Sequence, residues 1–165
     1  MNSEAESQLL RRVDGSGKAG ERDAVAELKR RYGSELPRLL LEHYKTAKSY
    51  KIRAACVYYC LDFSRVSNAA IELAKIAIAD KSRVVRYRAC MLLACSLRSD
   101  ILPTLRQMIP STERETRDDL IAAIDAIEHQ NKDFFLDREH SGMIALRVLS
   151  PSKTIDNRER NRGHP

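Results

Sequence analysis

Four cysteines are the residues best suited to hold a metal ion, because four thiolates can bind zinc. The two pairs are spaced by four and five residues, and neither spacing matches the usual zinc-ligand pair with two residues between the cysteines. On a helix, five residues turn the chain by about 500°, so the second pair would point apart. Each cysteine also lies in an apolar run, where it behaves as a small buried hydrophobe. We therefore expect reduced thiols packed in a core, at Cys56, Cys60, Cys90 and Cys95.

The dipeptide Glu-His occurs three times and would offer carboxylate and imidazole ligands, at Glu42-His43, Glu128-His129 and Glu139-His140. Two of these pairs lie at or beyond the edges of the repeats described below. We therefore expect that the ligands do not converge on one ion. The sequence predicts no metal site and no cofactor.

A run near the C-terminus places acid, base and nucleophile types within five residues, at Asp137, Arg138, Glu139, His140 and Ser141. Catalytic triads assemble across a fold, because adjacent side chains along one turn point apart. A charged hairpin turn is the first interpretation, and a recognition loop that contacts a partner is the second. No catalytic residue is predicted, and we expect that the protein is not an enzyme.

The densest basic cluster of the folded part comprises Lys81, Arg83, Arg86 and Arg88. These side chains either stay solvated and paired between repeats or form a patch that binds an anion. Both interpretations stay open from the sequence alone.

Tyr58 and Tyr59 are adjacent, so on a helix their side chains point about 100° apart and one of them should reach the surface. Tyrosine is enriched at protein-binding hot spots. Half-buried core aromatics would explain the same residues equally well. We take Tyr59 as the candidate for partner binding.

The bulk composition fits one soluble domain. The 165 residues are 43% hydrophobic and 32% charged. The N-terminus is polar without a signal region, and no apolar run approaches the ~20 residues of a membrane-spanning helix. We expect a cytoplasmic protein with no membrane segment. The net charge of +6 permits nucleic-acid binding but does not require it.

A repeat of about 33 residues must position these side chains. Pro37 and Pro103 stand in similar Leu-Pro-x-Leu segments 66 positions apart, each opening a first helix. Three dipeptides follow at steps of 33 and 31, each before a run rich in Ala, Cys, Leu and Ile: Ile52-Arg53, Val85-Arg86 and Thr116-Arg117. Two helices per period of this length are typical of an α-solenoid, in which stacked hairpins share one core.

This spacing resembles the HEAT repeat family, which has a proline in the first helix, an aspartate at the turn and Val-Arg in the second helix. Asp80 and Val85-Arg86 match that pattern, and the resemblance covers about residues 34–130. It implies that Arg86, like Arg53 and Arg117, pairs with turn aspartates between repeats. One HEAT-like family, the deoxyhypusine hydroxylases, holds two iron ions with His-Glu pairs, but the order here is reversed.

The predicted fold class is all-α: a short right-handed α-solenoid of about three HEAT-like helical hairpins. Short apolar runs at the end, with strand propensity and a Ser-Gly turn, predict a small β-hairpin that caps the last repeat. The last residues have the composition of a disordered basic tail. The expected parts are an N-terminal helical cap (1–33), repeats (34–63, 67–98 and 100–130), the hairpin (131–149) and the tail (150–165).

The function expected from this fold is protein binding by the concave face of the second helices. A more specific version is an immunity protein that blocks a bacterial toxin, because the Asp-Arg-acid-His-Ser-Gly turn resembles that of small bacterial HEAT-like proteins. The basic charge counts mildly against a nuclease toxin. The candidate partner-binding residues are Arg53, Tyr59, Arg83, Arg86, Arg88 and Arg117, with Asp137, Arg138, Glu139 and His140 at the rim.

The alternative is a nucleic-acid-binding protein that uses the same basic strip and the tail arginines Arg158, Arg160 and Arg162. Base-excision enzymes with HEAT-like folds are a third comparison. They hold a flipped base against aromatic side chains, whereas this chain has no Trp and only 5% aromatic residues.

Overall fold

The computed structural model describes residues 3–144, and this part of the chain is helical without a strand. The predicted all-α class is therefore confirmed. The α-helices are α1 (Ser3–Arg11), α2 (Ala19–Tyr32), α3 (Leu36–Thr46), α4 (Tyr50–Tyr59), α5 (Asn68–Ala77), α6 (Arg83–Ser96), α7 (Leu102–Met108) and α8 (Arg114–Glu128). Short 3-10 helices lie between them at Gly33–Glu35, Leu61–Phe63, Ser99–Ile101 and Ile109–Ser111, and another follows α8 at Lys132–Phe135.

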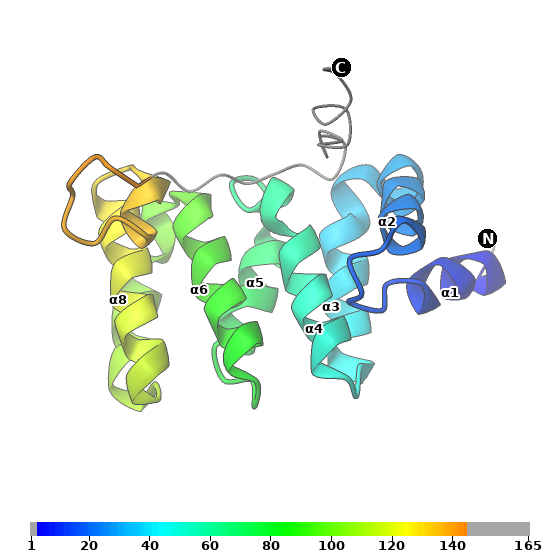
Figure 1. Ribbon diagram of the computed structural model, residues 1–165, viewed down its shortest axis with the longest axis horizontal. Coiled ribbons are helices and arrows are strands. Elements are labelled where there is room, and N and C mark those ends of the chain that lie inside the picture. Colours follow the sequence, from blue (N-terminus) through cyan, green and yellow to red (C-terminus); the bar gives the residue numbers. More distant parts are fainter. Residues whose placement is uncertain (1–2, 145–165) are drawn as a thin grey trace, which may run out of the picture.

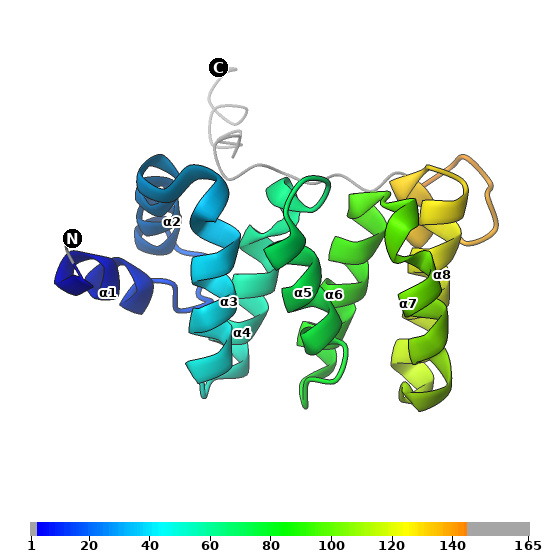
Figure 2. The same cartoon turned by 180° about the vertical axis from the view of Figure 1, so that it is seen from behind.

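The helices from α3 onward form a row of helix pairs, with the first helix of each pair in one layer and the second helix in the other. Figure 1 shows α4, α6 and α8 on the near side, and Figure 2 shows α3, α5 and α7 on the opposite side. Within the row, α4 packs against α6 and α6 packs against α8, while α3 packs against α5. Each first helix also packs against the second helix that follows it. The three helix pairs fall within residues 34–63, 67–98 and 100–130.

Local signals explain where the helices begin and end. Pro37 and Pro103 occupy the first turns of α3 and α7, where a missing N–H has no helical partner to lose. The hydroxyl of Ser67 caps α5 by accepting from the Ala70 N–H at 3.2 Å. Gly33 ends α2 with φ +50°, and its N–H donates to the Lys29 carbonyl.

Small side chains let the second helices approach one another, as their positions predict. Ala89 and Ala123 are fully buried, and Ala54 is 3% exposed. The four cysteines are free and buried among them, which confirms that they pack in the core. Burial raises the pKa of the Cys56 thiol to about 12 and that of Cys95 to about 11. These two thiols are therefore protonated at neutral pH.

The predicted C-terminal hairpin differs from the structure. The run Asp133-Phe-Phe-Leu, expected in its first strand, instead falls in a 3-10 helix (Lys132–Phe135) and its C-cap Leu136, and this helix packs against α6 and α8. The Asn131 side chain accepts from the Asp133 N–H and starts this helical turn instead of a strand. Most of the second strand (145–149) and the tail (150–165) lie outside the described residues.

No helix between residues 3 and 144 combines the length and the apolar character needed to cross a membrane.

Candidate functional site

A ladder of ion pairs joins successive helix pairs at the turns that precede α4, α6 and α8. Its best-formed rung is Arg53, which donates from Nε and Nη2 to the two oxygens of Asp80 at 2.6 and 2.9 Å. Asp80 also accepts from the Tyr44 hydroxyl at 2.7 Å and from the Ser82 N–H at 2.8 Å. Burial raises the pKa of the Asp80 carboxyl, but hydrogen bonds from Arg53, Ser82 and Tyr44 outweigh it and leave that pKa lowered.

Arg86 repeats this arrangement one step along the row. Its Nη2 reaches Glu113 at 2.7 Å, its Nε donates to the Thr116 hydroxyl at 2.7 Å, and its Nη1 donates to the carbonyls of Asp80 and Lys81. The acid lies 27 residues after the arginine in both rungs.

Arg117 ends the ladder. Its Nη2 donates to the Thr112 carbonyl at 3.0 Å, and within the described residues its buried Nε has no hydrogen-bond partner. The three arginines Arg53, Arg86 and Arg117 are thus half-buried structural side chains. They are poorly placed for the partner-binding role that the sequence assigned to them.

Arg83 and Arg138 converge on Asp119, whose side chain is only 4% exposed. Arg83 Nη2 lies 2.5 Å and Arg138 Nη2 lies 2.7 Å from its two oxygens. Arg83 also pairs with Glu115 at 3.2 Å. This arrangement ties α6, α8 and the segment after the last 3-10 helix together, and it pairs Arg83 of the predicted concave face and Arg138 of the predicted rim with an acid of the protein itself.

A shallow groove of about 500 Å³ lies on the second-helix layer between α4 and α6. Its α6 wall carries Val84, Tyr87, Arg88 and Met91, which share one helix face at spacings of three, four and seven residues. Tyr58 forms the opposite wall, with the Arg88 guanidinium 5.3 Å from its ring centre. Val84 is 46% exposed, so an aliphatic side chain is open to solvent in the groove.

Tyr58, and not the predicted Tyr59, lines this groove. Tyr59 is only 8% exposed and belongs to the buried core. The two rings lie edge to face with centres 5.3 Å apart, so the expected divergence of neighbouring side chains is present. The choice of Tyr59 as the surface residue was wrong. Arg88 stays at the groove, with its Nη1 donating to the Ala54 carbonyl at 3.0 Å.

The Asp137 carboxylate organises the turn that follows the last 3-10 helix. It is buried and accepts from the Ser141 N–H and hydroxyl, both at 2.8 Å, and from the Gly142 N–H at 2.6 Å. Burial raises the pKa of this carboxyl, but these hydrogen bonds outweigh it and leave the pKa lowered. Glu139 is exposed. The predicted acid–base–nucleophile run is therefore a turn in which the Asp137 carboxylate accepts hydrogen bonds from Ser141.

Replacing Asp137 with asparagine should loosen this turn, because an amide offers one acceptor oxygen in place of two charged ones. We expect faster hydrogen exchange at the Ser141 and Gly142 amides, measured by NMR. Glu139→Gln, an exposed neighbour on the same turn, is the control and should leave exchange unchanged. Equal exchange in both variants would contradict the role of Asp137.

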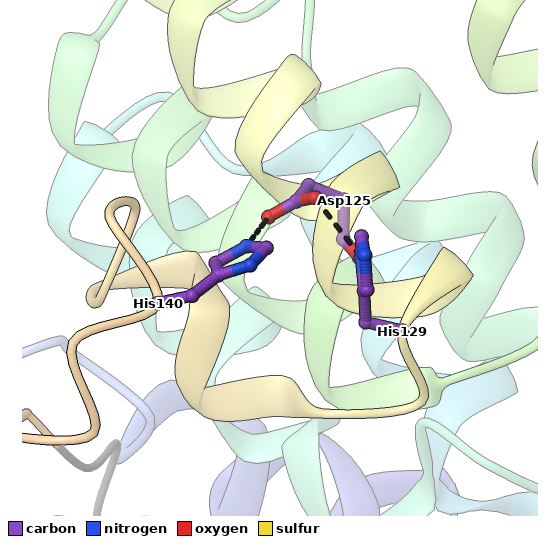
Figure 3. Close-up of side chains that lie close together, drawn as sticks. All are labelled: Asp125, His129 and His140. Carbon is purple, nitrogen blue, oxygen red and sulfur yellow. Dashed lines mark hydrogen bonds and ion pairs between the residues drawn. The ribbon is translucent and has the colours of Figure 1, made fainter.

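Two of the three Glu-His dipeptides bring their histidines together, contrary to the expectation from the sequence. His140 Nε2 lies 2.6 Å from Asp125 Oδ2, and His129 Nδ1 lies 3.0 Å from Asp125 Oδ1. Figure 3 shows the carboxylate between the two imidazole rings. His43 on α3 is not part of this group, and burial lowers its pKa.

The comparisons with known proteins find no relative of this chain. No family model matches the sequence, and neither a curated protein nor a solved structure matches it.

Sequence reasoning missed two features, and only one of them left a readable signal. Asp125 and His129 stand four residues apart, the spacing that places two ligands on one helix face. Asp119 left no such signal, because an aspartate in a helix gives no sign that it is buried between two arginines.

Proposed function

We propose that the protein is a non-enzymatic binding module that holds a protein partner on its second-helix layer. The single observation that carries this proposal is the groove between α4 and α6, where Val84 is open to solvent among Tyr58, Tyr87 and Met91. Exposed apolar groups gathered in one hollow indicate an interaction site, whereas scattered ones do not.

The scaffold in this proposal is a short α-solenoid of three HEAT-like hairpins. Two findings support it. The helix pairs recur along one row, and Arg53–Asp80 and Arg86–Glu113 link successive pairs at the same spacing of 27 residues. These ion pairs tie successive helix pairs together, which favours a groove that keeps its shape before a partner binds.

The partner chemistry proposed for the groove is an amphipathic helix with an acidic edge. The lining residues of α6 follow helical spacing along a straight wall, which suits an apolar helix face laid into the groove. Tyr58 and Tyr87 supply large rings of the kind that dominate binding energy. Arg88 at the wall favours a carboxylate on the partner.

Nucleic acid is the less favoured ligand, because three arginines of the predicted basic strip are already paired with acids of the protein. Arg53 faces Asp80, Arg86 faces Glu113 and Arg83 faces Asp119. A cation that binds a phosphate must be available to neutralise it and must not already be held by an acid of the protein. The proposed immunity role against a toxin has no further support from the described residues.

The test compares capture by tagged full-length protein with capture by Val84→Glu, from nuclease-treated lysate of the source organism. A carboxylate in the groove should be desolvated by the partner and should repel its acidic edge. We expect the variant to retain at least about 30-fold less of one stoichiometric protein, as for a hot-spot residue.

The matched control is Ile76→Glu, because Ile76 is 41% exposed on α5 in the other layer. It should capture as much partner as the wild type. Equal loss in both variants, or equal retention, would refute the groove. Loss of every captured protein after nuclease treatment would favour the nucleic-acid alternative.

A further inference from the structure

The group formed by Asp125, His129 and His140 is the metal-ligand cluster that the described residues bring together. One ligand atom from each side chain lies within 4.8 Å of the others. Asp125 lies in the last turn of α8 and His129 is the C-cap residue of that helix, whereas His140 comes from the turn that Asp137 organises. The ligands therefore come from two separate elements, whereas a chance pair of ligand residues would need only one helix.

The surroundings hold the His140 ring in place. It stacks on Phe134 with centres 3.7 Å apart and planes 10° apart, and it meets the His129 ring edge to face at 4.8 Å. The backbone of His140 has φ +54°, a left-handed conformation that few non-glycine residues adopt. The turn accepts this conformation, and the ring thereby faces α8.

We propose that Asp125, His129 and His140 bind one divalent transition-metal ion of the zinc class. Imidazole nitrogen with carboxylate oxygen suits such ions, and three protein ligands leave a fourth position open. The ion would join α8 to the turn at residues 137–142, at the end of the row away from α1.

Only small movements separate the present arrangement from a coordination shell. Ligand atoms in a tetrahedral zinc site lie about 3.3 Å apart, given zinc–nitrogen bonds near 2.05 Å. The two histidine nitrogens now contact the carboxylate at 2.6 and 3.0 Å, so each hydrogen bond would open slightly around the ion. The wider separations, up to 4.8 Å, would close by ring tilt and rotation of the Asp125 side chain.

The experiment is calorimetric titration of Zn²⁺ into untagged, chelator-treated full-length protein, repeated with Co²⁺ to read the visible absorption of a four-coordinate site. We expect one ion per chain. His129→Gln and His140→Gln should each weaken binding about 100-fold or more, since even loss of an outer partner of a metal ligand costs 10–100-fold. At a Zn²⁺ concentration 100 times Kd, the wild-type Tm should rise by about 5 °C or more.

Two full-length controls separate this site from other sources of binding. Glu139→Gln removes an exposed acid beside His140, and His164→Gln removes the histidine near the C-terminus. Both should bind Zn²⁺ like the wild type. Circular dichroism of the metal-free ligand variants checks that they fold.

Three results would overturn the proposal. They are no binding at millimolar Zn²⁺, unchanged binding in both histidine variants, and loss of binding in His164→Gln alone. In each case the contacts around Asp125 would be only a hydrogen-bonded tie between the turn and α8.

Discussion

Asp80→Ala is expected to lower the free energy of unfolding by about 3 kcal/mol, with a fall in Tm of about 6–12 °C. The Asp80 side chain is 4% exposed and faces an Arg53 side chain that is 16% exposed. Removing the carboxylate leaves this guanidinium and the Tyr44 hydroxyl without their acceptor in a dry environment. Urea denaturation followed by circular dichroism measures the change.

Asp100→Ala is the control for this prediction, because Asp100 makes two similar hydrogen bonds to Arg98 while its side chain is 62% exposed. Solvent screens that pair, so its loss should change stability little. If the two alanine variants lost equal stability, burial of the Arg53–Asp80 pair would not add to its contribution to the free energy of unfolding.

The acid dependence of stability gives a second readout for Asp80. Its pKa in the folded protein is lowered below the unfolded value, so the unfolded chain takes up this proton first as the pH falls. The contribution is therefore full at neutral pH and is lost as the pH drops through the folded pKa, below about 4. Asp80→Asn lacks this carboxyl, so its stability deficit should shrink below about pH 4.

Phe135→Ala should lower the free energy of unfolding by about 3–5 kcal/mol, the usual range for a phenylalanine in a core. Phe135 is fully buried although it lies in a short 3-10 helix, and its ring centre is 5.4 Å from that of Tyr87. The cavity would open where this helix packs against α6 and α8.

Phe134→Ala is the matched control, since Phe134 occupies the same turn but is only half-buried. It should cost less than half as much, because less apolar surface returns to water. The measurement is urea denaturation of both variants. If Phe135→Ala cost no more than Phe134→Ala, the 3-10 helix would not anchor the end of the row.

The helical part of the fold was predictable, because its signals are local and repeat. Pro37, Pro103 and the arginine dipeptides mark equivalent points of successive helix pairs, and one apolar face per helix requires a neighbour to cover it. The error came where the repeat stops. Phe134 and Ile144 have strand propensity, but propensity for strand depends on a partner strand, and α6 and α8 provide a helical surface instead.

The candidate site was less predictable, since it depends on which side chains are paired and on which face is covered. The Arg53 rung followed from the HEAT resemblance. Arg83 and Asp119 are 36 residues apart in the sequence, and no repeated spacing indicates that they are in contact. For Tyr58 and Tyr59, helix geometry shows that one must face outward but not which one. The meeting of His140 with Asp125 needs a left-handed backbone at position 140, where the sequence has a histidine and not a glycine.

The constant interval of the ladder also determines how such a chain can grow. Arg53 and Arg86 are 33 residues apart, and each reaches an acid 27 residues further on. A duplicated 33-residue segment (67–99) would place its own arginine 27 residues before the Asp80 of the following copy, so the new junction would form its rung without any substitution. Gene duplication can therefore lengthen the row and its groove at no cost in unsatisfied charge. Arg117 has no acid at the matching interval, because the residue 27 positions further on is Ile144.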